Sequence, residues 1–325
     1  MTSSIDHLKE KLDDAFRRSV PVLPPEELYS PITYALSIGG KRIRPLLVLL
    51  GNDLFGGIPE SAVPSAIGIE LFHNFTLLHD DIMDKAPLRR GKETVYRKWG
   101  INTAILSGDT MFVLAYDSLL KTSVQYLPSI LSLFNKTARE VCEGQQFDMN
   151  YETVNEVSIP EYMNMIRLKT AVLLACSLRA GAITADAGYL NEEQMYSFGE
   201  NLGMAFQLQD DLLDVYGDEK KFGKMIGGDI LAGKKTYLYL KALEVSSGSE
   251  RGAIIDLYNR NPETDSMKVE KVKKVFDDLG IANFTMQEID GYFSKAIYFL
   301  DAIQIDGQRK TDLRNMAASL LNRQS

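Results

Sequence analysis

The amino-acid sequence predicts an all-α fold of roughly ten or more helices. Apolar residues recur at steps of three and four over most of the chain, which is the spacing of one helix face. Strict alternation of apolar and polar residues, which is typical of half-buried strands, is nearly absent. No break is long or polar enough to be a domain linker, so we expect a single-domain helical bundle over residues 1–325.

Glycine and proline mark the breaks between the predicted helices. In order along the chain, these breaks are Pro24-Pro25, Pro31, Gly39-Gly40, Gly56-Gly57, Pro128 and Pro160. The stretch from Gly217 to Lys235 is rich in glycine and lysine, and helical spacing resumes at Tyr237, which indicates a functional loop. The segment from Asn261 to Lys274 is the most polar and least periodic part, so we expect a surface excursion there.

The composition is that of a globular protein and excludes several functions. Hydrophobic residues make up 45% of the 325 residues and charged residues 25%. The net charge of -8 argues against nucleic-acid binding, which needs a basic surface. The two cysteines, Cys142 and Cys176, fit a reducing compartment, so we expect a cytoplasmic protein. The first residues lack signal-peptide features, and no uninterrupted apolar stretch reaches the roughly 18 residues of a membrane span.

Two copies of one acidic pattern stand in apolar helical surroundings. The first aspartate motif comprises Asp80, Asp81 and Asp84, and the second comprises Asp210, Asp211 and Asp214. Residues four apart lie on one face of a helix, roughly 6 Å apart along its axis. Because like charges at this spacing repel one another, we expect a cation to bind each motif.

The chemistry of these motifs indicates a metal ion and a phosphate ligand. Carboxylate oxygens without a nearby cysteine or histidine cluster favour Mg²⁺ or Mn²⁺ over zinc. Protein-bound Mg²⁺ usually bridges carboxylates to phosphate oxygens. Basic residues that suit a phosphate occur in four places: Lys41, Arg42 and Arg44; Arg89 and Arg90; Lys169; Lys224 and Lys234.

Simpler interpretations of these patterns exist. A single Asp-Asp-x-x-Asp is more often a solvated acidic face. Two copies, each accompanied by basic clusters nearby in the sequence, favour a metal site. Gly228 to Lys234 has the spacing of a phosphate-binding P-loop. However, Lys235 stands where that motif requires Ser or Thr, and no strand precedes it, so we do not expect nucleotide binding.

Taken together, these residues resemble the trans-isoprenyl diphosphate synthases, or polyprenyl synthetases, from about Tyr34 to Lys241. Farnesyl and geranylgeranyl diphosphate synthases belong to this family. The resemblance implies a homodimer of all-helical subunits, in which the two aspartate motifs face each other across a deep central cavity and bind three Mg²⁺ ions. It also implies a prenyltransferase that joins isopentenyl diphosphate to dimethylallyl, geranyl or farnesyl diphosphate.

The same resemblance implies residue roles. The expected isopentenyl diphosphate site contains Lys41, Arg44, His73 and Arg90. The expected allylic diphosphate site contains Arg89, Lys169, Thr170, Gln207, Lys224 and Lys234. The expected catalytic residues are Asp80, Asp84, Arg89, Lys169, Thr170, Gln207, Asp210 and Lys224. All six aspartates of the two motifs are expected metal ligands.

The chemistry implied by the resemblance is condensation after ionisation. Mg²⁺ and lysines would neutralise the departing diphosphate, and the isopentenyl double bond would attack the allylic carbocation. A proton would then be lost to the released diphosphate. By family analogy, the dipoles of Thr170 and Gln207 would stabilise the cation, and an apolar cavity would exclude water.

Phe75 is the candidate for limiting product length. It lies five residues before Asp80, about 7.5 Å along the helix, where it could stop a growing chain. The first motif also lacks the insertion found in many bacterial farnesyl synthases. In family terms this indicates a short-to-medium chain product, with C20 favoured and C15 next.

Three alternatives stay open. A class I terpene cyclase ionises an allylic diphosphate but has no need of Lys41, Arg44 and Arg90. A non-catalytic family member acting as a binding subunit would have no reason to retain both aspartate motifs. The pair His79-Asp80 is typical of a metal phosphohydrolase, although the chain has few histidines to complete such a site.

Overall fold

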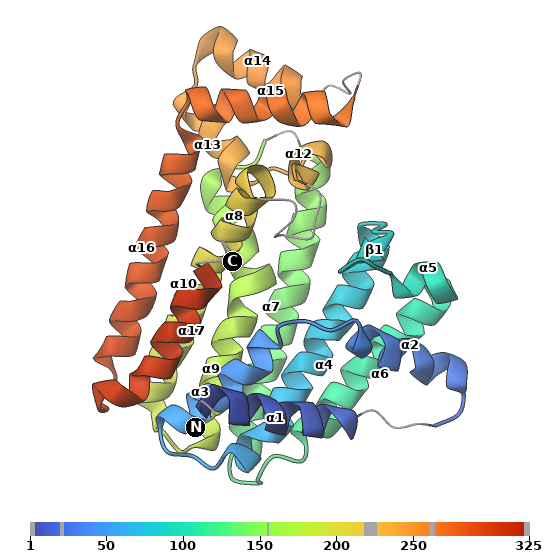
Figure 1. Cartoon of the computed structure of the whole chain (residues 1–325), viewed down its shortest axis with the longest axis vertical. Coiled ribbons are helices and arrows are strands. Elements are labelled where there is room, and N and C mark those ends of the chain that lie inside the picture. The colour runs from blue at the N-terminus through green and yellow to red at the C-terminus, as the bar shows by residue number, and fades with distance from the viewer. Residues whose placement is uncertain (1–3, 20–22, 155, 218–225, 260–263, 322–325) are drawn as a thin grey trace. The chain divides into compact units, whose positions relative to one another are not determined.

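The computed structural model describes residues 4–19, 23–154, 156–217, 226–259 and 264–321, and Figure 1 shows the whole chain. In these ranges the regular structure is helical except for one pair of two-residue strands. The predicted all-α class is confirmed. None of the helices in these ranges is both long and apolar enough to cross a membrane.

The chain divides into two compact units. Unit 1 comprises residues 1–136, 176–196 and 303–313, and unit 2 comprises residues 137–175, 197–302 and 314–325. The helices that cross a unit boundary are α7 (Leu127–Thr153), α9 (Val172–Thr184), α10 (Tyr189–Tyr216) and α17 (Thr311–Leu321). The expected single domain around a deep central cavity stays a prediction.

Unit 1 is built around α4. Its other elements are α1 (Ser4–Arg17), α2 (Glu26–Ser37), α3 (Ile43–Leu54), β1 (Leu88–Arg89), β2 (Lys92–Glu93), α5 (Val95–Trp99), α6 (Ile101–Leu119) and η2 (Gly307–Lys310). The long helix α4 (Pro59–Met83) packs mainly against α6 and α3 (Figure 1). A Cβ atom on Gly68 would lie 2.8 Å from the Leu119 side chain, so glycine permits the close approach of α4 and α6.

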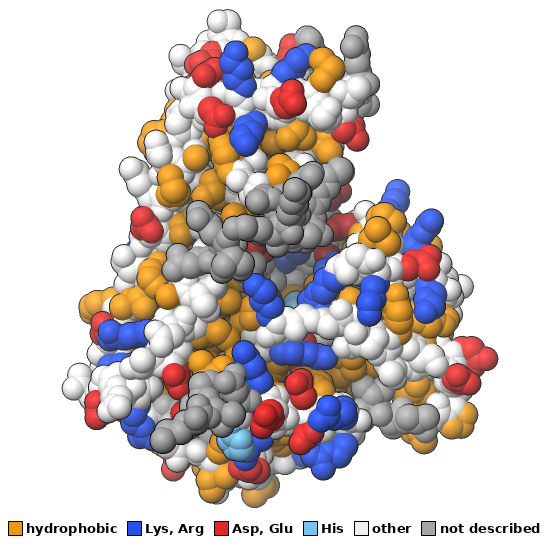
Figure 2. Space-filling view, viewed as in Figure 1, with side chains coloured by type: hydrophobic (Ala, Val, Ile, Leu, Met, Phe, Trp, Pro, Cys, Tyr) orange, Lys and Arg blue, Asp and Glu red, His pale blue; other side chains and the backbone are white. Residues whose placement is uncertain are grey.

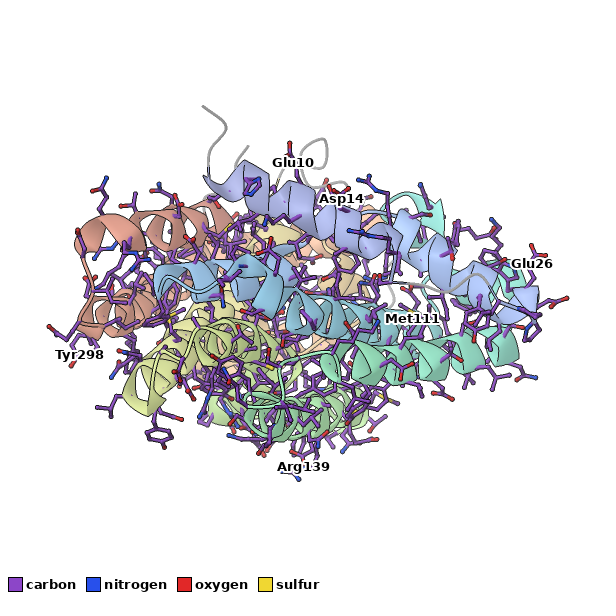
Figure 3. The ribbon with its side chains drawn as sticks, turned by 90° about the horizontal axis from the view of Figure 1, so that it is seen from below. Glu10, Asp14, Glu26, Met111, Arg139 and Tyr298 are labelled. Carbon is purple, nitrogen blue, oxygen red and sulfur yellow. The ribbon has the colours of Figure 1, made fainter. Side chains whose placement is uncertain are left out.

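Helix α1 of unit 1 has the buried and exposed faces that its apolar spacing predicts. In α1, Leu8 and Leu12 are buried, whereas Glu10 and Asp14, labelled in Figure 3, are exposed. Met111 of α6 has no exposed surface and lies among the helices in the same view. Burial of these apolar faces supplies the main driving force for packing the unit.

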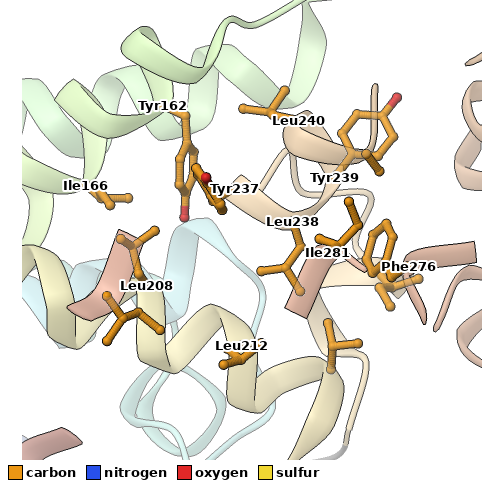
Figure 4. Packing of buried hydrophobic residues seen from close by; sticks show 14 of the residues in the cluster. Tyr162, Ile166, Leu208, Leu212, Tyr237, Leu238, Tyr239, Leu240, Phe276 and Ile281 are labelled. Carbon is orange, nitrogen blue, oxygen red and sulfur yellow. The ribbon is translucent and has the colours of Figure 1, made fainter. Parts of the chain in front are cut away.

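Unit 2 contains the remaining helices. They are α8 (Ile159–Ile166), the π-helical η1 (Arg167–Ala171), α12 (Gly228–Leu231), α13 (Tyr237–Val245), α14 (Gly248–Asn259), α15 (Asp265–Asp278) and α16 (Ile281–Ala302). A capping box begins α8, because the Ser158 backbone N–H donates to the Glu161 carboxylate at 2.8 Å and the Glu161 N–H donates back to the Ser158 hydroxyl. Buried side chains from α8, α10, α13, α15 and α16 form the core in Figure 4.

The polar segment expected as a surface excursion is mostly helical. It forms α15, which packs beside α14 (Figure 1), and Figure 2 shows both basic and acidic side chains over these two helices. Only three residues of α15 are buried, Lys268, Val272 and Phe276. Their four-residue spacing is a helix signal that the surrounding charges obscured.

Candidate active site

The first aspartate motif lies at the C-terminal end of α4, in unit 1. Asp81 is buried, with 5% of its surface exposed, whereas Asp84 is exposed and follows the last helical residue. Arg89 Nε donates to Asp81 Oδ1 at 2.8 Å, and Arg89 Nη2 donates to Asp80 Oδ2 at 3.3 Å. Burial raises the pKa of Asp81 to about 6, although Arg89 opposes the shift. The partial negative charge of the helix C-terminus adds to that of the motif, so this end of α4 attracts cations.

A tight hairpin presents two consecutive arginines beside the first motif. Strands β1 and β2 pair antiparallel, and the turn between them consists of Arg90 and Gly91, with φ angles of 53° and 73°. Two residues with positive φ match the twist of a two-residue hairpin. The Thr94 hydroxyl donates to the Ala86 carbonyl oxygen at 2.8 Å. The hairpin is thereby tied to the chain that leaves α4, which fixes the position of Arg89.

A second basic group in unit 1 surrounds His73 of α4. Arg44 Nη1 lies 3.1 Å from His73 Nε2. Burial, and then the charges of Arg44 and Arg90, lower the pKa of His73 well below its usual range, so the imidazole is neutral. A Cβ atom on Gly40 would lie 2.6 Å from Arg90 Nη1, so the backbone at Gly40 closely approaches this guanidinium. Lys41, the next residue, is exposed.

Glu70 is the buried counter-charge of this basic group. Its Oε1 accepts from Arg42 Nη1 at 3.2 Å and from Asn74 Nδ2 at 3.1 Å. Burial raises the pKa of Glu70, and Arg42 opposes the shift. Arg42 precedes α3 in a left-handed conformation, with φ of 47°. Its side chain therefore leaves the backbone at an unusual angle and reaches α4.

The second aspartate motif lies near the C-terminal end of α10, in unit 2. Asp211 has 3% of its surface exposed, and both of its carboxylate oxygens accept hydrogen bonds. Gln207 Nε2 donates to Oδ1 at 3.0 Å, and the Tyr162 hydroxyl donates to Oδ2. Asp214 Oδ2 accepts from the Asp229 backbone N–H at 3.0 Å. Burial, followed by the charge of Asp229, raises the pKa of Asp211 well above its usual range.

A cavity of about 100 Å³ in unit 2 adjoins the second motif. The π-helical η1 places Lys169 and Thr170 on its wall, and such segments often occur at functional sites. Lys169 Nζ donates to Asp148 Oδ2 at 2.6 Å, and the Thr170 hydroxyl donates to Gln207 Oε1 at 2.9 Å. The cavity therefore combines an ammonium group with a chain of directed hydrogen bonds.

The loop after the second motif adds two lysines to this cavity. Lys234 and Lys235 both line it. The Tyr258 hydroxyl donates to the Lys234 carbonyl oxygen at 2.7 Å, and Lys235 Nζ donates to the Tyr151 carbonyl oxygen at 2.6 Å. These bonds fix the backbone on which Lys234 stands. Lys224 lies outside the described residues.

Comparison with known proteins places the chain in a family. The sequence profile described as polyprenyl synthetase matches residues 25–279. The chain belongs to the polyprenyl synthetase family. It is 33% identical to the geranylgeranyl diphosphate synthase of Methanosarcina mazei over 325 residues, which cover 98% of each chain. A crystal structure of a geranylgeranyl pyrophosphate synthase is 42% identical, covers 100% of both chains and superposes with a TM-score of 0.94.

A second solved polyprenyl synthase bears on the ligands of the family. The structure from Caulobacter crescentus is 27% identical, has a TM-score of 0.88 and covers 100% of this chain and 99% of that one. It is described as a complex with calcium and isoprenyl diphosphate. The predicted family and the predicted enzyme class, a trans-prenyltransferase, are confirmed.

The structure of this polyprenyl synthetase brings the predicted residues together in two sets. Unit 1 holds the first aspartate motif with Arg89, and the group of Arg44, His73 and Arg90. Unit 2 holds the second motif around one cavity with residues predicted for the allylic site, Lys169, Thr170, Gln207 and Lys234. The roles of these residues stay predictions.

Four residues of this arrangement were missed from the sequence: Glu70, Asp148, Tyr162 and Asp229. Glu70 had a signal, because a lone carboxylate between apolar residues of a helix needs a buried partner. Asp148 and Lys169 are 21 residues apart on different elements, so no spacing rule connects them. Tyr162 has the apolar spacing of a core residue, which conceals the use of its hydroxyl.

The carboxylates of this polyprenyl synthetase fit a hard divalent cation. Both motifs lie in the last turns of their helices, where the helix dipole adds negative charge. The described residues that line the unit 2 cavity include Asp148, Asp211 and Asp229 but neither cysteine nor histidine. Oxygen ligands of this kind suit Mg²⁺ or Mn²⁺. Within the described part of the chain, no group of three or more ligand side chains is arranged to hold a metal ion.

Proposed function

We propose that this chain joins isopentenyl diphosphate to an allylic diphosphate and that its main product is the C20 geranylgeranyl diphosphate. The observation that carries the proposal is the basic group around His73, which unit 1 holds in addition to the Arg89 contacts with the first motif. A cyclase, which acts on one diphosphate, has no use for a second anion site. Relatives named geranylgeranyl diphosphate synthase support the C20 product.

The two diphosphates bind to different residues in this proposal. Isopentenyl diphosphate binds Lys41, Arg44, His73 and Arg90. Guanidinium groups suit diphosphate oxygens because their forked donors make paired hydrogen bonds. His73 is neutral, so it contributes hydrogen bonding and no charge. The allylic diphosphate, which is dimethylallyl, geranyl or farnesyl diphosphate, binds Arg89, Lys169, Lys224 and Lys234.

The aspartate motifs are the proposed metal-binding groups. We expect Asp80, Asp84 and Asp210 to have the largest effect on catalysis. Three Mg²⁺ ions, for which Mn²⁺ could substitute, would neutralise the charge that develops on the leaving diphosphate. The hydrogen bonds to Asp81 and Asp211 hold the buried carboxylate of each motif in one orientation.

The residues of the chain then guide the reaction. The allylic C–O bond breaks, and its electron pair leaves with the diphosphate, which Lys169 and Lys234 attract. The double bond of isopentenyl diphosphate supplies the electrons of the new C–C bond, and the neighbouring carbon loses a proton to the released diphosphate. Thr170 directs its oxygen dipole at the cation, and Gln207, whose Oε1 accepts from the Thr170 hydroxyl, orients that dipole. Positioning of the two substrates lowers the entropic part of the barrier.

We propose that Phe75 limits chain length. Its ring stacks on Phe112 of α6, with ring centroids 5.0 Å apart and an interplanar angle of 9°. Phe72 and Phe134 pack on the same cluster. A ring supported in this way resists displacement by a growing prenyl chain, because its aromatic neighbours are themselves packed. C15 remains the second candidate product.

An apolar stripe on α6 supports the proposed homodimer. Leu106 and Val113 of α6 and Leu120, which directly follows its last residue, are each at least 55% exposed and lie seven residues apart, so they share one face. Exposed apolar patches of this kind usually mark interfaces. We expect Val113→Glu to convert a dimer to a monomer in light scattering, whereas Leu190→Glu, at a position 78% exposed outside this stripe, leaves the dimer intact. The low cysteine content supports a cytoplasmic location.

The proposed function is tested by dependence on the second substrate. The chain is incubated with Mg²⁺ and each allylic diphosphate, with and without isopentenyl diphosphate, and the products are identified. We expect diphosphate release and longer prenyl diphosphates only when isopentenyl diphosphate is present. Cyclic hydrocarbon without isopentenyl diphosphate would identify a cyclase, free phosphate alone a phosphohydrolase, and no consumption a non-catalytic subunit.

A further inference from the structure

A chain of hydrogen bonds links a buried tyrosine to the wall of the unit 2 cavity. The chain consists of Tyr162, Asp211, Gln207 and Thr170, and we call it the Thr170 relay. The Tyr162 hydroxyl and Gln207 Nε2 both donate to the Asp211 carboxylate, and the Thr170 hydroxyl donates to Gln207 Oε1. All four residues line the cavity.

The donors and acceptors of the Thr170 relay run in one direction. Both oxygens of Asp211 accept, Oδ1 from Gln207 Nε2 and Oδ2 from the Tyr162 hydroxyl, so Gln207 presents its NH₂ group to Asp211. The amide oxygen of Gln207 then faces Thr170. The Thr170 hydroxyl has a single proton and gives it to this oxygen at 2.9 Å. Its lone pairs are therefore directed away from Gln207.

Tyr162 sits where it can hold the relay in this arrangement. It has 3% of its surface exposed, and Figure 4 shows its ring beside Ile166 and Tyr237, with its hydroxyl toward the part of α10 that carries Leu208. The buried ring holds the hydroxyl against Asp211 Oδ2. Without this donor, the carboxylate could rotate and Gln207 could turn its NH₂ group toward Thr170.

We propose that Tyr162 is a positioning residue which, through the Thr170 relay, turns the oxygen lone pairs of Thr170 toward the cavity, where they stabilise the developing allylic cation. This inference rests on the proposed function, because it needs a carbocation in the cavity. A fixed dipole directed at developing charge stabilises a transition state without reorganisation. Tyr162 acts on the reaction only through its partners in the relay.

A double-mutant cycle tests this coupling. Tyr162→Phe removes only the hydroxyl, and Thr170→Val removes the dipole at the end of the relay. We expect Tyr162→Phe to lower kcat about tenfold, the rate equivalent of roughly 1.4 kcal/mol, with the KM values of both diphosphates unchanged. In the Thr170→Val background, the same substitution is expected to lower kcat less than about twofold, because coupled residues are not additive.

Tyr258→Phe is the matched control. It also removes a buried tyrosine hydroxyl of unit 2, but one that donates to the Lys234 carbonyl oxygen, outside the relay. Its effect on kcat is expected to be the same in the wild-type and Thr170→Val backgrounds. Should Tyr162→Phe fail to fold, Asp211→Asn keeps the side-chain size and lets the Gln207 amide turn. Because Asp211 is also a proposed metal ligand, kcat of this variant is measured at saturating Mg²⁺. That variant is expected to couple with Thr170→Val in the same way.

The outcomes separate this inference from the proposed function. Elongation by the wild type together with a non-additive cycle supports both. Elongation with an additive cycle, or with a Tyr162→Phe defect that higher Mg²⁺ concentration restores, overturns the relay and leaves the proposed function intact. A wild-type chain that does not elongate an allylic diphosphate overturns both, since the relay would then have no cation to stabilise.

Discussion

Gly40→Ala is expected to weaken the binding of isopentenyl diphosphate while leaving the fold intact. The Cβ atom of the new alanine would lie 2.6 Å from Nη1 and 2.9 Å from Cζ of Arg90. Such a contact is too short to persist, so the guanidinium must move. Because it is the end of a flexible side chain, it can move without disturbing the backbone of unit 1.

The expected size of the effect follows from the contact that Arg90 would lose. A hydrogen bond to a charged group contributes about 1.5–3 kcal/mol, and each 1.4 kcal/mol is tenfold in affinity. We therefore expect the KM for isopentenyl diphosphate to rise by about 10- to 100-fold, with the KM for the allylic diphosphate almost unchanged. Gly40 has φ of 146°, so the alanine also strains the backbone, at a cost of about 1–3 kcal/mol.

Gly39→Ala is the matched control for backbone strain. Gly39 also has a positive φ, 88°, but a Cβ atom there would meet nothing within 4 Å. Both variants are expected to lose similar stability in urea unfolding, and only Gly40→Ala to raise the KM for isopentenyl diphosphate, measured at saturating allylic diphosphate. Equal KM values for the two variants would refute the assignment of Arg90 to this substrate.

Three further predictions concern product length, packing and pH. Phe75→Ala is expected to yield products longer than C20 in chromatography of labelled products. Tyr189→Ala, at a position 69% exposed, should give the wild-type pattern. An unchanged pattern for Phe75→Ala would show that another residue limits chain length. Gly203→Ala brings a Cβ atom to 2.5 Å from the backbone of η1 and should lower the unfolding free energy by about 1–3 kcal/mol. Gly252→Ala, in open space on α14, should raise the unfolding free energy by about 0.5–1 kcal/mol. A gain of stability in Gly203→Ala together with a loss in Gly252→Ala would contradict this account of the packing. The pKa of Glu70 is raised above its usual 4.5, so the folded state binds more protons and the unfolding free energy falls as pH rises above 4.5. Glu70→Gln should remove the contribution of Glu70 to the slope of unfolding free energy against pH, measured by urea unfolding at several pH values. An unchanged slope would show that Glu70 does not titrate.

The all-α fold class and the two aspartate motifs could be predicted from the sequence, because both depend on the spacing of nearby residues. A three- or four-residue period is read from neighbouring residues, and so is the arrangement of carboxylates on one helix face. The two-residue strands around Arg90 were not predicted, since their turn depends on positive φ at Arg90 as well as at Gly91. Non-glycine residues adopt this conformation rarely, so the sequence carries little sign of it.

The partners of the predicted residues could not be deduced from the sequence. Asp211 depends on Tyr162, which is 49 residues away on another helix, and Lys234 depends on Tyr258 of α14. Such contacts form when helices pack, and the apolar pattern alone does not specify which polar groups meet. The sequence thus predicts the reacting groups more readily than the residues that orient them.

The central claim is elongation of an allylic diphosphate by this chain. It is tested most directly by incubating the protein with Mg²⁺, farnesyl diphosphate and ¹⁴C-labelled isopentenyl diphosphate, and measuring the length of the labelled prenyl chain. We predict a single main labelled product, geranylgeranyl diphosphate. Label that remains entirely in isopentenyl diphosphate, while farnesyl diphosphate is converted to cyclic hydrocarbon or left intact, would contradict the claim.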